Sequence, residues 1–230
     1  MSARYAKHQG ITLAGAGELR ADTLTRALRH APHLVAADGG ADQVVALGHR
    51  PDLVVGDLDS VSDALLQTLT PQQLRPVHTQ DDTDFDKALD LIDAPFILAT
   101  GFSGARLDHT LASMNTLVRH GTRKILVDTG HDLCCVLPPA LSLSLPPGTR
   151  VSLFPMGRVA CTSTGLQWPV DGLQFDPAGK IGTSNTAKGG PVRLTADAPL
   201  MLLLLPVEFM DAVLPALLSA RSWPPPVRAR

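Results

Sequence analysis

The sequence predicts an α/β protein, with an N-terminal, Rossmann-like domain that contains a parallel sheet and a C-terminal antiparallel β-sandwich domain. Up to about Asp128, short apolar runs alternate with helical segments, which is typical of a parallel sheet covered by helices on both faces. After Gly130 the helical pattern stops, and short β-prone runs follow between turns rich in proline and glycine. We therefore expect an α/β domain over residues 1–130, a β-rich domain over 131–215 and a tail over 216–230.

The individual elements follow from apolar periodicity and from turn residues. The predicted helices are Arg20–His30, Ala41–Leu47, Ser62–Leu69, Asp84–Ile92 and Leu107–His120. The predicted strands after Gly130 are Leu133–Leu137, Val151–Phe154, Leu173–Phe175, Val192–Thr195 and Leu200–Leu205. Glu208–Ser219 has the pattern of an amphipathic helix, whereas the prolines of Trp223–Pro226 exclude a helix and favour a loose extended tail. Gly15–Gly17 lacks the third glycine of a dinucleotide-binding motif, so we interpret it as a turn.

The composition is that expected of a cytoplasmic enzyme. The chain has 230 residues, 20 basic and 22 acidic side chains and a net charge of −2, so nothing attracts it to nucleic acid or to a membrane surface. Met1–Gln9 is too polar for a signal peptide, and the most apolar stretch, Met201–Leu205, is too short to cross a bilayer. The three cysteines fit neither a disulfide framework nor a zinc site, and we expect all three to be buried apolar side chains.

Two aspartates, Asp57 and Asp59, follow the apolar run Leu53–Val55, which we predict to be a buried strand ended by Gly56. Side chains just beyond the carboxyl end of such a strand lie where open α/β sheets bind their ligands. Carboxylates this close together repel unless a cation or hydrogen-bond donors lie between them, and oxygen ligands favour Mg²⁺. A solvated acidic turn would explain an isolated motif of this kind, but further motifs accompany it.

A second acidic cluster contains four aspartates within the six positions 81–86. Thr83 is placed to cap a helix whose first turn holds Asp84 and Asp86, and acidic residues suit that end of a helix. Capping explains one or two of these side chains, whereas four close carboxylates need a positive partner. We interpret Lys87 as a partner of Asp84 or Asp90 on the helix surface, with contact to phosphate as the alternative.

Glycines and one arginine follow two other predicted strands. Gly101–Arg106 lies between the strand Phe96–Ala99 and a helix, so its backbone amides can approach a phosphate, and Arg106 adds a permanent, planar cation. Asp38, Gly39 and Gly40 follow the apolar run Val35–Ala37 in the same way. We therefore expect acids, glycines and the arginine at one edge of the sheet.

In this order the motifs closely resemble those of the thiamine pyrophosphokinase family, over about Ala36–Leu205. The matching segments are Asp38–Ala41, Gly56–Ser60, Gln80–Asp84, Lys87–Leu89, Arg106–His109, Gly165–Pro169 and Gly182–Asn185. Two features depart from the family pattern. Asp42 replaces the usual asparagine and adds a negative charge near the expected phosphate site. Ser103–Ala105 replaces a more glycine-rich turn, which Ala105 tolerates if its φ is negative.

The resemblance implies an enzyme that transfers a pyrophosphoryl group from ATP to the hydroxyl group of thiamine and releases AMP. It implies Asp57, Asp59 and Asp84 as ligands of Mg²⁺, with Asp38 and Asp81 acting directly or through water. It implies phosphate binding by Arg106 and by backbone amides near Gly39, Gly40 and Gly104. Asp108 is expected to orient Arg106 or to hold a water on the metal. His109 belongs to the expected ATP site, although a histidine at a helix start is more often structural than catalytic.

The resemblance also implies the binding site for thiamine. Trp168 offers an aromatic face to a flat or cationic ring, Ser184 and Asn185 offer small polar groups, and Gln80 is placed to bind the pyrimidine. A homodimer is implied, with the active site between the sandwich of one subunit and the α/β domain of the other. Two alternatives stay open: a pyrophosphokinase for another alcohol, such as a hydroxymethylpterin, and a non-catalytic nucleotide-binding module. The second has no use for so many aspartates, because a triphosphate already carries excess negative charge.

Overall fold

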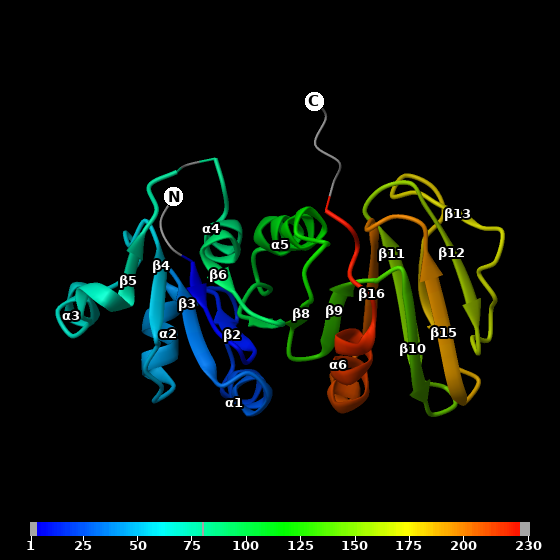
Figure 1. The fold of residues 1–230 in the computed structure, drawn as a ribbon, viewed down its shortest axis with the longest axis horizontal. Helices are drawn as coiled ribbons and strands as arrows, with labels where there is room; N and C mark the ends of the chain where they lie inside the picture. Colours follow the sequence, from blue (N-terminus) through cyan, green and yellow to red (C-terminus); the bar gives the residue numbers. More distant parts are fainter. Residues whose placement is uncertain (1–3, 80, 226–230) are drawn as a thin grey trace. The chain divides into compact units, whose positions relative to one another are not determined.

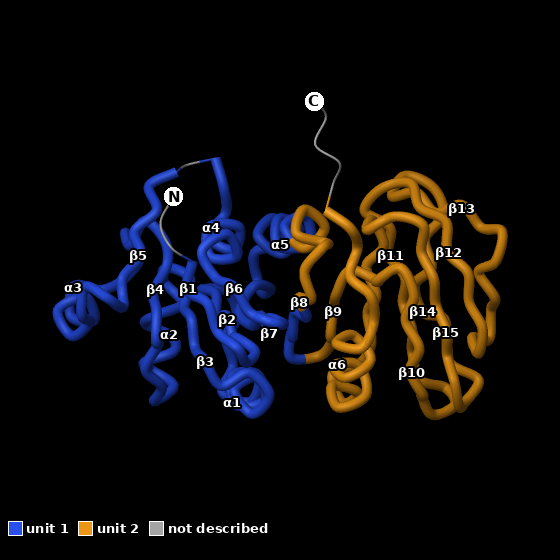
Figure 2. Tube along the Cα trace, in the orientation of Figure 1, with its two compact units in different colours: residues 1–116, 126–130 blue, residues 117–125, 131–230 orange. Residues whose placement is uncertain are grey.

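The structure, a computed structural model, describes residues 4–79 and 81–225. It divides into two compact units (Figure 2). Unit 1 comprises residues 1–116 and 126–130, and unit 2 comprises residues 117–125 and 131–230. Within the described ranges, no helix combines the length and the apolar character that crossing a membrane requires.

Unit 1 is built on six strands that neighbour one another in the order β8-β7-β2-β3-β4-β5 (Figure 1). These strands are β2 (Ile11–Ala14), β3 (His33–Ala37), β4 (Leu53–Gly56), β5 (Leu74–Pro76), β7 (Ile97–Thr100) and β8 (Ile125–Asp128). Strand β2 pairs in parallel with both β3 and β7, and β3, β4 and β5 continue the parallel pairing. The chain therefore adds strands on one side of β2 and later on the other, which makes a topological switch point between β2 and β7. The short strands β1 (Tyr5–Ala6) and β6 (Ile92–Asp93) form a separate parallel pair.

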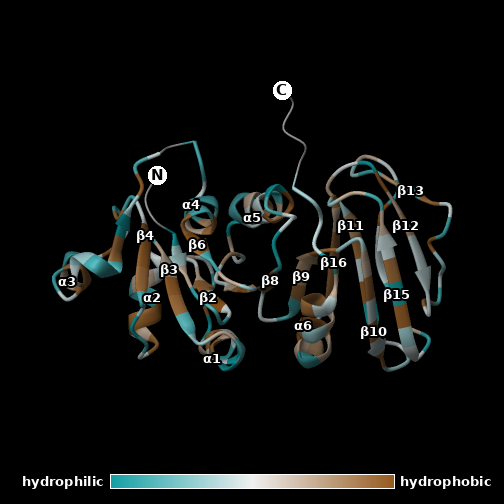
Figure 3. Ribbon diagram, in the orientation of Figure 1, coloured by the Kyte–Doolittle hydropathy of each residue, from teal (hydrophilic) through white to brown (hydrophobic). Residues whose placement is uncertain are grey.

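The five helices predicted for the N-terminal half are all present. They are α1 (Ala21–His30), α2 (Gly40–Ala46), α3 (Asp63–Leu66), α4 (Asp84–Leu91) and α5 (Leu107–Arg119), and a 3₁₀ turn, η1 (Pro71–Gln73), follows α3. Leu24 of α1, Val44 of α2 and Leu65 of α3 pack in one buried cluster with alternate residues of β2, β3 and β4. The intervening strand residues, such as Leu13 and Val35, are also fully buried, so both faces of these strands are covered. The apolar colour of the strands is visible in Figure 3.

Unit 2 contains two groups of antiparallel strands: β14-β11-β16-β9, which belong to a larger mixed sheet, and β10-β15-β12-β13, which form a sheet of their own. The strands are β9 (Asp132–Val136), β10 (Ala140–Leu145), β11 (Arg150–Pro155), β12 (Val159–Thr164), β13 (Gln174–Phe175), β14 (Gly182–Thr186), β15 (Gly190–Ala196) and β16 (Met201–Pro206). The sequence predicted five of these and missed β10, β12 and β14. In β10 two serines separate the leucines, β12 is polar from Thr162 to Thr164, and in β14 no side chain is apolar, so these strands lack a continuous apolar run.

The C-terminal segment begins with a 3₁₀ turn, η2 (Val207–Phe209), and α6 (Met210–Ser219). The predicted helix is therefore present, and it includes residues 216–219, which the predicted domain plan had placed in a tail. Four apolar side chains of α6 are buried, and the helix contacts β10. Trp223 is not loose, because its indole N–H donates a hydrogen bond to the carbonyl of Leu137 (2.9 Å). Pro226 lies outside the described residues.

The three cysteines are Cys134, Cys135 and Cys161, and all are free and buried, as predicted. Burial raises the pKa of the Cys135 and Cys161 thiols to about 12 and raises the pKa of Cys134 well above its usual value. These side chains are therefore neutral thiols that pack as small apolar groups.

Two loops meet at the switch point, the loop after β2 and the loop after β7. The backbone N–H of Gly15 donates to the carbonyl of Thr100 (2.8 Å), and the N–H of Gly17 donates to the carbonyl of Gly101 (2.7 Å). A side chain on Gly101 would place its Cβ 2.5 Å from the carbonyl oxygen of Gly15, which is closer than any stable contact. Gly15–Gly17 is therefore more than a turn, because it holds the loop that leads to Arg106.

Gly101→Ala and Gly48→Ala are a matched pair, since both glycines have φ in the left-handed region (75° and 82°). Alanine at Gly48 meets no atom within 4 Å, so we expect it to lower the free energy of unfolding by about 1 kcal/mol through backbone strain alone. Alanine at Gly101 adds the clash with Gly15, and we expect this clash to lower the free energy of unfolding by a further amount of about 1–3 kcal/mol. Urea unfolding followed by circular dichroism measures both, and equal losses would contradict the close contact of the loops.

Candidate active site

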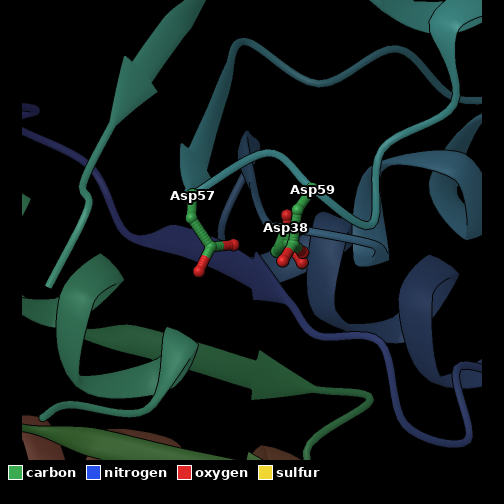
Figure 4. A group of neighbouring side chains, drawn as sticks. All are labelled: Asp38, Asp57 and Asp59. Carbon is green, nitrogen blue, oxygen red and sulfur yellow. The ribbon is translucent and has the colours of Figure 1, made fainter. Parts of the chain in front are cut away.

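Three aspartates at two neighbouring strand ends form one group (Figure 4). Asp38 follows β3, Asp57 and Asp59 follow β4, and one carboxylate oxygen of each lies within 4.8 Å of the others. The backbone is strained where it presents these side chains, because Asp38 (φ 44°) and Leu58 (φ 66°) adopt the left-handed conformation without being glycine. Strain of this kind costs about 1–3 kcal/mol per residue and is concentrated at functional sites.

Asp38 is the most buried member of the group, with 4% of its surface exposed. Burial raises the pKa of its carboxyl group, and the charges of Asp84 and Asp57 act in the same direction. Among the described residues, none donates a hydrogen bond to its buried oxygen Oδ1. A buried carboxylate oxygen without a donor is costly unless a cation binds it. Oxygens on opposite sides of a Mg²⁺ ion are about 4 Å apart, so this all-oxygen group fits such an ion.

Asp84 is joined to this group through Lys87. The Nζ atom of Lys87 lies 3.2 Å from Oδ2 of Asp57 and 3.1 Å from Oδ1 of Asp84. Only 5% of the lysine side chain is exposed, so our interpretation of Lys87 as a helix-surface residue was wrong, although Asp84 is indeed one of its partners. Burial is the largest influence on the lysine and lowers its pKa, but the two carboxylates together outweigh it and raise the pKa above the usual value. In return, Lys87 lowers the pKa of Asp57.

The other acids of the second cluster have different surroundings. Thr83 caps α4 as predicted, since its Oγ1 accepts a hydrogen bond from the backbone N–H of Asp86 (3.2 Å). Asp86 is 2% exposed, and its Oδ2 accepts hydrogen bonds from the hydroxyl groups of Thr83 (2.7 Å) and Thr116 (2.8 Å), which links α4 to α5. Asp81 is exposed and is not a member of the three-aspartate group. Gln80 lies outside the described residues.

Arg106 and Asp108 form a two-point ion pair at the start of α5. The distances are 3.3 Å from Nε to Oδ1 and 2.7 Å from a terminal guanidinium nitrogen to Oδ2, and both side chains are exposed. The guanidinium lowers the pKa of Asp108. Asp108 thus contacts the guanidinium that we expect it to orient, and its role in the reaction stays a prediction. The neighbouring His109 is exposed, and its carbonyl oxygen accepts a hydrogen bond from Ser113.

The glycines expected near phosphate have structural reasons of their own. A Cβ on Gly40 would lie 2.7 Å from the carbonyl oxygen of Ala14, so α2 approaches β2 too closely for any side chain. Gly104 has φ 148°, and its Cβ would lie 3.0 Å from the backbone nitrogen of Glu18. Gly39 is less confined, because a Cβ on this residue would lie 3.2 Å from the side chain of Ser60. Close backbone packing at the strand ends therefore explains Gly40 and Gly104 without any ligand.

The structure accommodates both departures from the family pattern. The carboxylate of Asp42 accepts hydrogen bonds from the backbone N–H (2.9 Å) and the hydroxyl group (2.5 Å) of Ser62. It therefore attaches α2 to the end of the loop that carries Asp59. Ala105 meets the condition set for it, because the described non-glycine residues with positive φ are Asp38, Leu58 and Ser184.

The three candidate thiamine residues of unit 2 lie together. The side-chain oxygen of Asn185 accepts hydrogen bonds from the backbone N–H groups of Trp168 (3.2 Å) and Thr186 (2.8 Å), and its nitrogen donates to the carbonyl of Trp168 (2.6 Å). Asn185 is 6% exposed, whereas Trp168 is 60% exposed. Ser184 is exposed, has φ 62° and donates its backbone N–H to Ser152 (3.0 Å). The amide of Asn185 thus holds the segment that presents the indole, a role that the sequence alone did not indicate.

Comparison with known proteins finds relatives with similar sequences. Thiamine pyrophosphokinase 1 of Oryza sativa subsp. japonica is 29% identical over 201 residues, which cover 73% of this chain and 76% of the relative. Thiamine pyrophosphokinase 1 of Arabidopsis thaliana is 28% identical over 207 residues, which cover 75% of this chain and 77% of the relative.

Solved structures share the fold. A thiamin pyrophosphokinase from Geobacillus thermodenitrificans has a TM-score of 0.71 at 24% identity, over 86% of this chain and 96% of that one. A thiamin pyrophosphokinase from Candida albicans has a TM-score of 0.73 at 16% identity, over 89% of this chain and 92% of that one.

Two family models match separate parts of the chain. The catalytic domain of thiamin pyrophosphokinase matches residues 24–127, and the vitamin B1 binding domain of thiamin pyrophosphokinase matches residues 140–201. The matched segments together cover more than half of the chain and include both the three-aspartate group and the Trp168–Asn185 segment. The chain belongs to the thiamin pyrophosphokinase family.

Proposed function

We propose that this protein transfers a pyrophosphoryl group from ATP to the hydroxyl group of thiamine, giving thiamine diphosphate and AMP. The observation that carries the proposal is the group formed by Asp38, Asp57 and Asp59, with its buried oxygen that lacks a donor among the described residues. A transfer that involves a triphosphate needs positive charge close to the phosphate oxygens, and this group is suited to hold it. Family membership supports thiamine as the acceptor.

We propose that unit 1 is a Rossmann-like domain and that it binds the nucleotide and the metal ion. Asp57, Asp59 and Asp84 would hold Mg²⁺, as expected from the sequence, together with the buried Asp38, while Asp81 contributes directly or through water. When bound, the ion supplies charge that offsets the developing negative charge on the phosphates. Arg106, oriented by Asp108, binds phosphate oxygens with its planar fork. An aspartate of the cluster accepts the proton of the attacking hydroxyl group.

The remaining phosphate contacts and the thiamine site are assigned in the same way. Backbone amides near Gly39, Gly40 and Gly104 donate to the phosphates, and His109 borders the nucleotide. In unit 2, proposed as the β-sandwich domain, Trp168 stacks on the thiamine ring and Ser184 binds its polar edge, while Asn185 holds the Trp168 segment and contributes to the pocket. Gln80 is proposed to bind the pyrimidine. The cytoplasmic location expected from the sequence stays a prediction.

Product analysis tests the function directly. We expect AMP release from ATP and Mg²⁺ to depend on thiamine. Release that depends on a hydroxymethylpterin instead would support the alternative pyrophosphokinase, which the match to a vitamin B1 binding domain does not favour. Nucleotide binding without AMP release would support the non-catalytic module.

Removal of single carboxylates tests the metal site. Asp59→Asn and Asp57→Asn should lower turnover about a thousandfold or more, since each removes a metal ligand. Asp38→Asn should lower turnover similarly and also raise the melting temperature of the metal-free protein at neutral pH. The pKa of Asp38 is raised in the folded protein, so at a pH above the pKa of the unfolded state its ionised carboxyl group destabilises the fold. An amide carries no charge, so Asp38→Asn removes this destabilisation.

Asp90→Asn is the matched control, because Asp90 is exposed on α4 and is not a member of the group. We expect its turnover to stay close to that of the wild type. Near-normal turnover in folded Asp59→Asn would remove Asp59 from the metal site, and a lower melting temperature in Asp38→Asn would show that its carboxylate stabilises the fold.

Substitution of Arg106 tests phosphate binding. Arg106→Lys keeps the charge but loses the two-point fork, so we expect a moderate loss of affinity for an unreactive ATP analogue, and a larger loss in Arg106→Ala. Asp108→Asn should cause an intermediate loss if the carboxylate orients the guanidinium. Calorimetry measures all three, and unchanged affinity together with unchanged turnover in Arg106→Ala would leave Arg106 with a structural role only.

Substitutions in unit 2 test the thiamine site. Trp168→Ala should raise the KM for thiamine about five- to thirtyfold through loss of about 1–2 kcal/mol of stacking, with the affinity for nucleotide nearly intact. Trp168→Phe keeps an aromatic face and should retain most of the affinity. Asn185→Ala should raise the same KM, because the loop bearing Trp168 loses its hydrogen bonds. A lower affinity for nucleotide with an unchanged thiamine KM would contradict this assignment.

The proposed homodimer is tested by subunit exchange. If one subunit supplies the aspartates and the other the Trp168 segment, inactive Asp57→Asn chains mixed with Trp168→Ala,Asn185→Ala chains should recover partial activity at a thiamine concentration far below the raised KM, where neither chain alone turns over measurably. One of the two sites of the mixed dimer then combines an intact aspartate group with an intact thiamine segment. No recovery after heterodimer formation has been demonstrated would mean that each chain builds its own site.

A further inference from the structure

Lys87 is a buried cation with two acidic partners. Its Nζ lies 3.2 Å from Asp57 and 3.1 Å from Asp84, and only 5% of its side chain is exposed. Burial of an ammonium group is unfavourable unless charged partners compensate for the lost water, and these two carboxylates do so. The lysine is anchored on α4, a helix that packs against β3 and β4, so its position is fixed by the core of unit 1.

Asp57 is shared between the lysine and the candidate metal group. It belongs to the set of Asp38, Asp57 and Asp59 whose oxygens lie within 4.8 Å of one another, and its Oδ2 also contacts Lys87. A divalent ion held by this group would therefore lie close to a fixed positive charge. Cations at such a separation repel each other, and the repulsion is strong where water screens it poorly. Lys87 therefore opposes the binding of a metal ion to the free protein.

A nucleotide changes this balance. The phosphates of ATP bring several negative charges to the same edge of the sheet, which offset the repulsion between the lysine and the ion. Mg²⁺ is commonly bound by one or two carboxylates together with substrate phosphates. The site should therefore bind the ion together with the polyphosphate more tightly than it binds the ion alone.

We propose that Lys87 is a positioning residue that makes metal binding depend on the nucleotide. Its ammonium group holds Asp57 and Asp84 in place before the substrates arrive, and it keeps the affinity of the free protein for divalent ions low. The inference rests on the proposed function, since it concerns the same metal site. It adds a role for a side chain that we assign neither to the metal ligands nor to the reacting groups.

Binding of Mn²⁺, measured by the electron paramagnetic resonance of the free ion, tests the proposal without any turnover. Lys87→Met removes the charge and keeps an unbranched apolar chain suited to a buried position. Without nucleotide, we expect it to bind Mn²⁺ about tenfold or more tightly than the wild type. Lys87→Arg keeps the charge and should stay within a few-fold of the wild type. Lys180→Met is the matched control, because it removes an exposed lysine of unit 2 with the same change in net charge.

An unreactive ATP analogue provides the second measurement. The affinity of the wild type for Mn²⁺ should rise strongly when the analogue is added, and in Lys87→Met the rise should be much smaller. Lys87→Gln removes the charge but retains donors for the carboxylates, so it replaces Lys87→Met if that variant does not fold. Mn²⁺ affinity that is unchanged or weaker in the folded charge-free variant, without nucleotide, would overturn the proposal.

The double variant Asp57→Asn,Lys87→Met shows whether the effect acts through the shared carboxylate. Compared with Asp57→Asn alone, it should gain much less Mn²⁺ affinity than Lys87→Met gains over the wild type, and an equal gain would overturn the role of Asp57. AMP release by the wild-type protein is measured separately with thiamine. Failure of that assay would reject the proposed function, while the Mn²⁺ titrations would still decide the effect of Lys87 on the metal site.

Discussion

Repulsion between carboxylates is the constraint on which this site depends. Asp38, Asp57 and Asp59 each have a carboxylate oxygen within 4.8 Å of the others, and Asp84 is connected to them through a shared lysine. Hydrophobic packing cannot relieve such repulsion, and burial of Asp38 increases it. The surrounding fold resists it by fixing the backbone, with left-handed residues beside the strand ends and a lysine embedded in the core of unit 1. The cluster is therefore maintained at the expense of stability, as is common at functional sites.

The parallel strands determine which side chains meet. Because β3 and β4 are neighbours and run in the same direction, the residues that follow them emerge at one edge, and β2 and β7 bring two glycine-containing loops to the same edge. The loops are fastened to each other by backbone hydrogen bonds, and Phe85 of α4 stacks on Phe102 with ring centroids 4.0 Å apart. The first turn of α4, which contains Asp84, is thereby packed against the loop that leads to Arg106.

The sequence was sufficient for the helices, for the strand ends and for the acids that follow them, because apolar periodicity and glycine placement are local signals. It was insufficient where a residue's role depends on a distant partner. Lys87 has the spacing of a surface ion pair, and only the packing of α4 shows that it is buried. Asn185 resembles a ligand-binding amide until its hydrogen bonds to Trp168 are seen. Strands β10 and β12 were missed because serines interrupt the leucines of β10 and the second half of β12 is polar, which leaves no continuous apolar run.

The distribution of the thiols gives this protein a natural reporter. All three cysteines belong to unit 2, where they are buried and neutral, and unit 1 contains none. An alkylating reagent reacts with the thiolate of an accessible cysteine, so labelling requires the strands of unit 2 to open. The rate of labelling in the native protein therefore reports local opening of the β-rich unit alone, with no contribution from unit 1. The dynamics of one half of the molecule are accessible by chemistry without an engineered probe.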